Sequence, residues 1–108
     1  MTGADVDQVR EAIRNGDATL PPVVVTEALS KPASEPAFVS VVISLALIPI
    51  REGYWKRAGE LRADVLSSGF KAKLADVLIA QSCIDHDVPL ITYDADFRHF
   101  TRAGLKLA

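Results

Sequence analysis

The sequence has few residues that cross-link a chain or bind soft metals. Cys83 is its only cysteine, which excludes an internal disulfide and a zinc site built from thiolates. The residue lies in an apolar run, where we expect it to be a small buried hydrophobic residue of a protein in the reducing cytoplasm. Aromatic residues make up only 6% of the chain, so the core is expected to be aliphatic.

Long apolar segments and an excess of positive charge are also missing. The apolar stretch of residues 37–50 is broken by serines and contains Pro49, and it is too short to span a bilayer. Asp5, Asp7 and Glu11 lie where the apolar segment of a signal peptide would be, so we expect none. The net charge is −2, and any contact with nucleic acid must therefore come from a local basic patch.

What the chain does contain is an ordinary globular composition, with 49% apolar and 24% charged residues among 108. This length predicts one domain, residues 1–108. Short strands alternate with helices in the pattern, which indicates an α/β fold with a parallel sheet. We expect helices at residues 5–15, 23–30, 34–47, 52–67 and 74–86, strands at 18–20, 47–50, 89–93 and 105–107, and a loop with one helical turn at 94–102.

Local signals set several of these boundaries. The prolines at 21–22 favour a helix that opens directly after them. The helix at 34–47 is strongly apolar, so we expect it to be mostly buried, with Ser34 as its N-cap. The helix at 74–86 is apolar almost all round and should be deeply buried. The buried face of the helix at 52–67 is expected to contain Trp55, Ala58, Leu61 and Val65.

Four acidic residues, Glu27, Asp76, Asp94 and Asp96, each lie where a strand hands over to a helix or loop. In a parallel sheet these handover points share one edge, where open sheets bind ligands. We place Glu27 and Asp76 in first helical turns, while Asp94 and Asp96 follow a strand. Gathered carboxylates repel each other unless a hard cation such as Mg²⁺ or Mn²⁺ lies among them. The pattern therefore predicts a metal site suited to phosphodiester hydrolysis.

Each acid also has a plainer interpretation, which the sequence leaves open. Asp94 and Asp96 flank one alanine after a strand, and aspartate in a turn often bonds its own backbone. Asp76 lies in an apolar helix, where a buried carboxylate needs a partner or a cation; alternatively it interacts with the helix dipole. Glu27 is either a metal ligand or an exposed acid.

Basic side chains flank the acids in sequence. Lys73 precedes Asp76, and Arg98 and Arg102 follow the acid pair. We expect these three cations to contact the phosphates of a nucleic acid, although a solvated surface would also explain them. The two histidines, His86 and His99, have no spacing typical of a zinc site.

Three segments carry a resemblance to a known family. Leu74-Ala-Asp76-Val-Leu-Ile-Ala80 is followed by Pro89-Leu-Ile-Thr-Tyr-Asp94-Ala-Asp96-Phe97, and Leu20-Pro-Pro-Val-Val-Val-Thr-Glu27-Ala-Leu29 precedes both. Together they resemble a PIN-domain ribonuclease, and most closely the toxin half of VapBC-type toxin–antitoxin modules. The likeness extends over nearly the whole chain.

The resemblance implies a metal-dependent endoribonuclease that acts on RNA and is inhibited by a cognate antitoxin. It also implies a PIN-like (flavodoxin-like) parallel sheet flanked by helices. Carried over residue by residue, Glu27, Asp76 and Asp94 are the catalytic acids and Asp96 is an accessory acid, the four holding Mg²⁺ or Mn²⁺. Thr92 is expected to help shape the loop before the acid pair.

One departure from the family pattern concerns the start of the chain. The family opens with an apolar strand that ends in Asp followed by Thr or Ser, and we expect this N-terminal strand and its helix, roughly 15–20 residues, to be absent here. The strand lies inside the family's sheet, so its loss leaves inner edges that invite pairing with another chain. We therefore expect a homodimer or strand exchange, with a start assigned too late or a shortened chain as alternatives. Asp5 or Asp7 either substitutes for the lost acid or caps a helix.

Two functional interpretations remain. The first is an RNA-cleaving toxin, and the second is a catalytically weakened PIN-like binding or assembly module without nuclease activity. Haloacid-dehalogenase-type phosphatases carry an acid–spacer–acid pair near their start, before a long domain, whereas only residues 97–108 follow it here. Sugar-nucleotide transferases need a sizeable domain before such a pair. Neither class fits the short elements of this chain.

Overall fold

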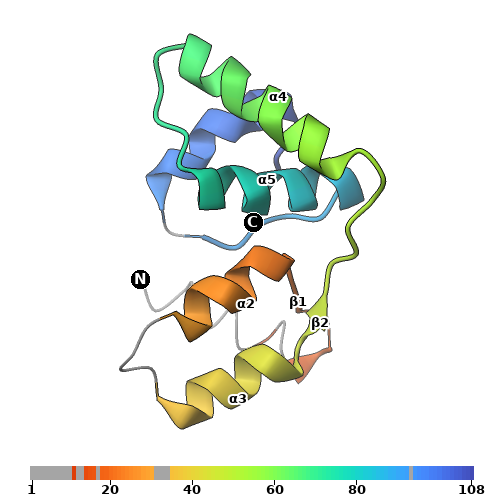
Figure 1. The fold of residues 1–108 in the computed structure, drawn as a ribbon. Helices are drawn as coiled ribbons and strands as arrows, with labels where there is room; N and C mark the ends of the chain where they lie inside the picture. Colours follow the sequence, from red (N-terminus) through yellow and green to blue (C-terminus); the bar gives the residue numbers. More distant parts are fainter. Residues whose placement is uncertain (1–10, 12–13, 17, 31–34, 93) are drawn as a thin grey trace.

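Short parallel strands joined by helices make up the part of the chain that the computed structural model describes, which is residues 11, 14–16, 18–30, 35–92 and 94–108. The mixed α/β class predicted from the sequence is confirmed, with a smaller sheet than expected. The elements are β1 (Thr19–Leu20), α2 (Pro22–Leu29), α3 (Pro36–Ser44), β2 (Ala46–Leu47), α4 (Tyr54–Ser67), α5 (Leu74–His86) and the 3-10 helix η1 (Ala95–Ala103). In Figure 1, α4, α5 and the blue η1 form the upper part of the molecule, and α2, α3 and both strands form the lower part.

The described residues form one two-stranded parallel sheet and, separate from it, one isolated bridge. In the pair, Thr19 of β1 lies opposite Ala46 of β2, and Leu20 lies opposite Leu47. The bridge joins Leu90 to Leu107, also in parallel. The strands expected at 89–93 and 105–107 are therefore wrong in extent for the described residues, and the strand expected at 47–50 begins and ends earlier. Prolines at 49 and 89 explain part of this, because proline has no N–H to donate to a ladder.

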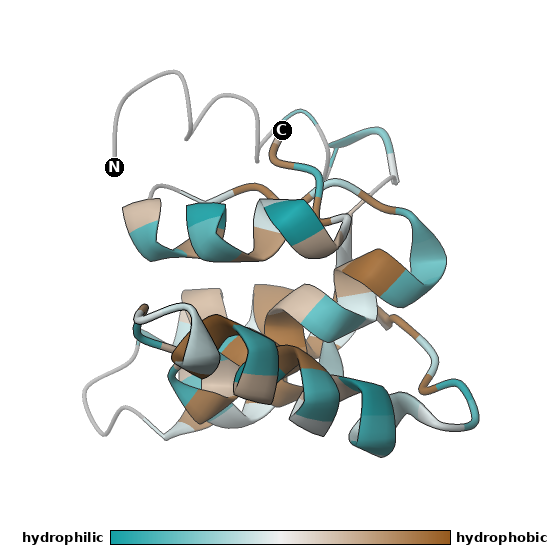
Figure 2. Ribbon diagram, turned by 90° about the horizontal axis from the view of Figure 1, so that it is seen from above, coloured by the Kyte–Doolittle hydropathy of each residue, from teal (hydrophilic) through white to brown (hydrophobic). Residues whose placement is uncertain are grey.

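The main core forms where α4, α5 and η1 meet. Its buried members include Leu61 and Val65 of α4, Val77 of α5 and Phe100 of η1. Cys83 belongs to the same cluster, as expected, and burial raises the pKa of its thiol to about 11. Hydrophobic and hydrophilic segments alternate along the helices in Figure 2, which is the pattern of helices that bury one face. None of the helices in the described part of the chain has the length and apolar content needed to cross a membrane.

The boundaries of α2, α4 and α5 were predicted well, whereas α3 ends at Ser44 and not at residue 47, and η1 is a nine-residue 3-10 helix and not a single turn. α5 spans the expected residues, and α2 begins at Pro22, directly after Pro21. On α4 the expected buried Trp55 is 67% exposed, and its neighbour Tyr54 is 3% exposed instead. The Tyr54 hydroxyl donates a 2.7 Å hydrogen bond to the Leu78 carbonyl of α5. The buried face thus starts one residue earlier than the sequence pattern suggested, because Tyr54 can bond across to α5.

The expectation that the helix at 34–47 is mostly buried is wrong. α3 begins at Pro36 and buries Val42, while Phe38, Val41 and Ile43 are 51%, 42% and 62% exposed. Among the described elements α3 packs against α2, and it lies at the lower end of the molecule in Figure 1. The other faces of an apolar helix therefore have no described element to cover them. Ser34, the expected N-cap, lies outside the described residues.

Most of the helix predicted at residues 5–15 lies outside the described residues. Asp5 and Asp7 lie outside the described residues, so the roles expected for them stay predictions. The Asn15 N–H donates a 3.0 Å hydrogen bond to the Glu11 carbonyl. Gly16 has a φ of 73°, a left-handed conformation that glycine adopts readily at a helix end.

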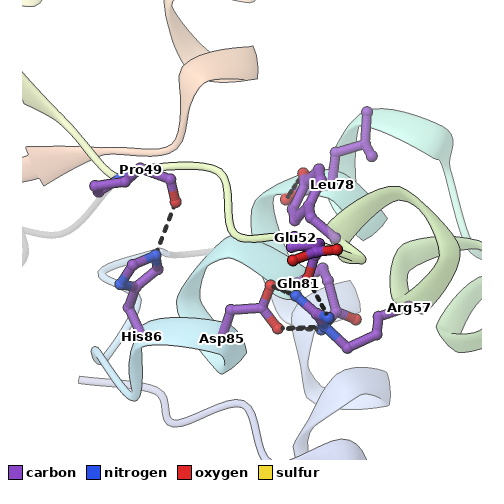
Figure 3. A network of polar contacts seen from close by, with 8 residues as sticks. Pro49, Glu52, Arg57, Leu78, Gln81, Asp85 and His86 are labelled. Atoms are coloured by element: carbon purple, nitrogen blue, oxygen red, sulfur yellow. Dashed lines mark hydrogen bonds and ion pairs between the residues drawn. The ribbon is translucent and has the colours of Figure 1, made fainter.

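An ion pair links the start of α4 to the end of α5 (Figure 3). The Arg57 guanidinium donates to both Asp85 carboxylate oxygens, at 3.0 and 2.6 Å, and Gln81 donates to one of them at 2.8 Å. The pKa of Asp85 is held below its usual value, chiefly by the Arg57 hydrogen bond. Nearby, His86 Nε2 and the Pro49 carbonyl are 2.7 Å apart. These contacts fix the β2–α4 connection against α5.

We predict that Asp85→Asn lowers the free energy of unfolding at pH 7 by about 1–2 kcal/mol, because Arg57 loses its charged acceptor. A depressed carboxyl pKa stabilises the fold above the unfolded-state value of about 3.9 and loses that contribution as the pH falls through the folded-state value. The difference between the two proteins should therefore shrink in acid. Urea denaturation between pH 2.5 and 7 measures it.

The matched control is Asp87→Asn. Asp87 pairs with Lys106 at 2.8 Å, and both side chains are exposed, so its loss should cost less than about 0.5 kcal/mol. An equal cost for the two substitutions would contradict the special role of the Arg57–Asp85 pair.

Candidate metal and nucleic-acid site

Asp76 lies in the first turn of α5, where the sequence placed it. The helix begins at Leu74, and Lys73 holds the N-cap position with an extended backbone. The Asp76 side chain is half-buried. A carboxylate in this position interacts favourably with the positive end of the helix dipole.

Three of the predicted acids act on the fourth, Asp76, at this end of α5. The pKa of Asp76 is raised, first by burial and next by the charge of Asp94; Lys73 opposes the shift, and Glu27 and Asp96 add to it. Each of these side chains is therefore close enough to Asp76 to interact with it electrostatically. Residues far apart in the sequence, from α2, α5 and the start of η1, are thus brought within electrostatic range of Asp76.

Glu27 lies later in its helix than expected. α2 has no acidic residue in its first turn, because the helix begins at Pro22 and Glu27 is its sixth residue. The placement of Glu27 in a first turn is therefore wrong. α2 packs against α5, and this contact brings the exposed Glu27 within electrostatic range of Asp76.

Asp94 has a structural role in addition to its charge. It is the N-cap of η1, and its Oδ1 accepts a 2.9 Å hydrogen bond from the Asp96 N–H. The Asp94 N–H donates in turn to Thr92 Oγ1 at 3.1 Å. Thr92 thus shapes the loop as expected, and the turn chemistry left open for Asp94 coexists with its effect on Asp76.

The donor chemistry of the cluster suits a hard divalent cation. All four groups are carboxylates, which Mg²⁺ and Mn²⁺ prefer to thiolate or imidazole, and a cation would relieve their mutual repulsion. Within the described residues, however, no three His, Cys, Asp or Glu side chains are grouped so that they could hold a metal ion. The acids share one electrostatic field without forming a closed set of ligands.

The three predicted phosphate-binding cations lie in different places. Lys73 is exposed and is the one that acts on Asp76. Arg98 is exposed, and its Nε donates a 3.1 Å hydrogen bond back to the Ala95 carbonyl. Arg102 lies in the last turn of η1 and lines a separate cavity.

That cavity, of about 390 Å³, opens between the end of α4 and η1. Asp64, Phe70, His99 and Arg102 are among the residues that line it. The Phe70 and His99 rings stack with their centroids 4.3 Å apart and an angle of 17° between their planes. Sequence reasoning gave no role to Phe70 or Asp64. An aromatic residue directly after the helix-ending Gly69 was the available signal.

We predict that Asp76→Asn stabilises the protein in EDTA at pH 7. An acid whose pKa is raised by folding contributes less stability as the pH rises from about 3.9 through the folded-state value. Asparagine removes this loss, and we expect a gain below about 1 kcal/mol, because water screens a half-buried carboxylate. Urea denaturation at pH 3 and pH 7 measures the effect, and a variant that is less stable than wild type at pH 7 would contradict it.

Comparison with known proteins agrees with the chemistry of the acid cluster. A family model described as PIN domain matches residues 4–103. No curated protein and no solved structure matches the chain. PIN domains are generally nucleases that act on RNA or other nucleic acids, usually with divalent metals such as Mg²⁺ or Mn²⁺, and they often occur in toxin–antitoxin systems. Since the match extends over nearly the whole chain, the protein belongs to the PIN domain family.

Proposed function

We propose that this protein is a metal-dependent endoribonuclease and the toxin component of a toxin–antitoxin system, held inactive by a cognate antitoxin. The observation that supports the proposal is that the charges of Glu27, Asp94 and Asp96 all act on the half-buried Asp76 and raise its pKa. A cation bound beside Asp76 would relieve this repulsion.

In this proposal Glu27, Asp76, Asp94 and Asp96 hold Mg²⁺ or Mn²⁺. The bound cation supplies an activated water and offsets the charge of the phosphodiester. Lys73, exposed beside Asp76, contacts a phosphate of the RNA.

The hydrogen bond from the Asp96 N–H to Asp94 Oδ1 orients the Asp94 carboxylate, and the bond from the Asp94 N–H to Thr92 fixes the backbone before it. Such fixed ligands lose less entropy when they bind a cation or substrate. The chain's own contribution is therefore to position the acids and the flanking lysine.

A PIN-like binding or assembly module without nuclease activity is the second candidate. One observation favours it: among the described residues no group of three side chains is already arranged to hold a metal ion. A module of this kind would bind RNA or another protein and leave RNA intact in Mn²⁺. Cleavage of single-stranded RNA in Mn²⁺ separates the two candidates.

We predict that Asp76→Asn and Asp94→Asn each lower RNA cleavage in Mn²⁺ by at least about 100-fold, because each removes a charged ligand. Asparagine caps a helix as well as aspartate does, so Asp94→Asn should keep the melting temperature of the wild type. Calorimetric titration with Mn²⁺ should show weaker binding for both variants.

Asp87→Asn, at an exposed ion pair with Lys106, is the control and should cleave and bind Mn²⁺ like the wild type. Wild-type activity in Asp76→Asn would remove Asp76 from the mechanism. Wild-type protein that binds no Mn²⁺ and cuts no RNA would favour the second candidate.

We also propose that the protein is a homodimer, with α3 in the interface. Phe38, Val41 and Ile43 expose large apolar side chains on a helix that contains no charged residue from Pro36 to Ser44. Such faces on soluble proteins usually mark interaction sites. Two copies related by a two-fold axis place the same residues opposite each other, which an uncharged face permits without like-charge repulsion.

The opening strand expected to be absent stays a prediction, because residues 1–10 lie outside the described part.

Light scattering at low micromolar concentration should give the mass of a dimer, and Phe38→Asp with Ile43→Asp should give a monomer, because each copy then places charges in the interface. Trp55→Asp, at an exposed residue of α4, serves as the control and should stay dimeric. A monomeric wild type would contradict the prediction.

A further inference from the structure

The 3-10 pitch of η1 arranges three chemically different residues along one side. A 3-10 helix has three residues per turn, so residues three apart are superimposed along its axis. Asp96, His99 and Arg102 occupy one such row of η1 (Ala95–Ala103). Phe97 and Phe100 are buried in the core beneath the helix. The row of Asp96, His99 and Arg102 lies beside this buried row, with Asp96 and His99 half-buried and Arg102 exposed.

This row leads from the acid cluster to the cavity. Asp96 acts on Asp76 at one end, whereas His99 and Arg102 line the cavity at the other. Two turns of a 3-10 helix separate Asp96 from Arg102, about 12 Å along the axis. A short stretch of single-stranded nucleic acid can therefore reach from the acids to the cavity.

The cavity is lined by an aromatic ring, a cation and a carboxylate, which are the kinds of group that contact unpaired nucleotides. Phe70 is 45% exposed although its ring stacks on His99, so part of this aromatic platform is open to a ligand. Arg102 supplies a cation suited to a phosphate, and Asp64 supplies an acceptor suited to the N–H groups of a base edge. The volume of about 390 Å³ is within the range of small-molecule sites.

Two serines also line this cavity. Ser67 and Ser68 line the cavity at the end of α4, and the Ser68 hydroxyl donates a 3.0 Å hydrogen bond to the Asp64 carbonyl. Gly69 follows with a φ of 86° and turns the chain so that Phe70 faces the cavity. The end of α4 therefore places the Phe70 ring beside polar side chains of the cavity.

We propose that this cavity is a nucleotide subsite, which takes one unpaired base of single-stranded RNA beside the cleavage point. The base stacks on the Phe70–His99 pair, Arg102 binds a phosphate, and Asp64 accepts from an amino group of the base. The inference rests on the proposed ribonuclease function, because it assumes an RNA strand across the acids. Uracil, which has no amino group, should bind least well.

The test is the binding of a single-stranded RNA that carries 2-aminopurine, a fluorescent base whose emission is quenched by stacking. Binding in EDTA keeps metal-dependent cleavage out of the measurement. Phe70→Leu should weaken binding by about 5- to 150-fold, the range for loss of one base-stacking ring, and should abolish the quenching. Phe70→Tyr should retain both.

Two controls make the result specific. Trp55→Leu removes an exposed aromatic ring at the opposite end of α4, and its affinity should equal that of wild type. An unchanged melting temperature for Phe70→Leu, expected because the side chain is exposed, shows that weaker binding does not come from unfolding.

The outcomes separate this subsite from the nuclease proposal. Equal affinity and quenching in Phe70→Leu and wild type would overturn the subsite, whether or not the protein cuts RNA. The absence of any single-stranded RNA binding would overturn it as well. Phe70-dependent binding by a protein that does not cleave RNA in Mn²⁺ would support the subsite and remove the nuclease function.

Discussion

The burial of α5 is the constraint on which the rest of this structure depends. The helix is apolar almost all round, and it packs against α4, α2 and η1. Hydrophobic burial of this helix therefore draws three other elements to it. Because these elements carry Glu27, Asp94 and Asp96, the same packing that excludes water from α5 brings three acids within electrostatic range of Asp76.

The acids near Asp76 lower the stability of the folded protein while no cation is bound there. A half-buried carboxylate with three acidic neighbours raises the energy of the folded protein, and only Lys73 opposes that effect among the causes that act on Asp76. Carboxyl groups with a pKa perturbed in this way are typical of functional sites. At the other end of α5 the buried carboxylate of Asp85 is paired directly with Arg57, whereas none of the ion pairs found among the described residues includes Asp76.

Sequence reasoning predicted the features that depend on local chemistry. Prolines and glycines gave the start of α2 and the end of α4, and the apolar pattern gave both ends of α5. The exposure of Phe38 and Ile43 was not predictable, because an apolar pattern does not say whether another element covers it. The Phe70–His99 stack was missed because it joins a loop to a 3-10 helix, and the expectation of a single helical turn after Asp94 hid the three-residue repeat.

Cys83 is chemically unreactive while the protein is folded. Its thiol is buried in the core and has a pKa of about 11, so almost no thiolate exists at neutral pH to meet an alkylating reagent or an oxidant. Since the chain has no other cysteine, modification of Cys83 requires the core to open. The rate at which a thiol reagent labels the native protein therefore reports how often the core around Cys83 opens, and a cysteine placed on the surface would be the one reactive thiol of the folded protein.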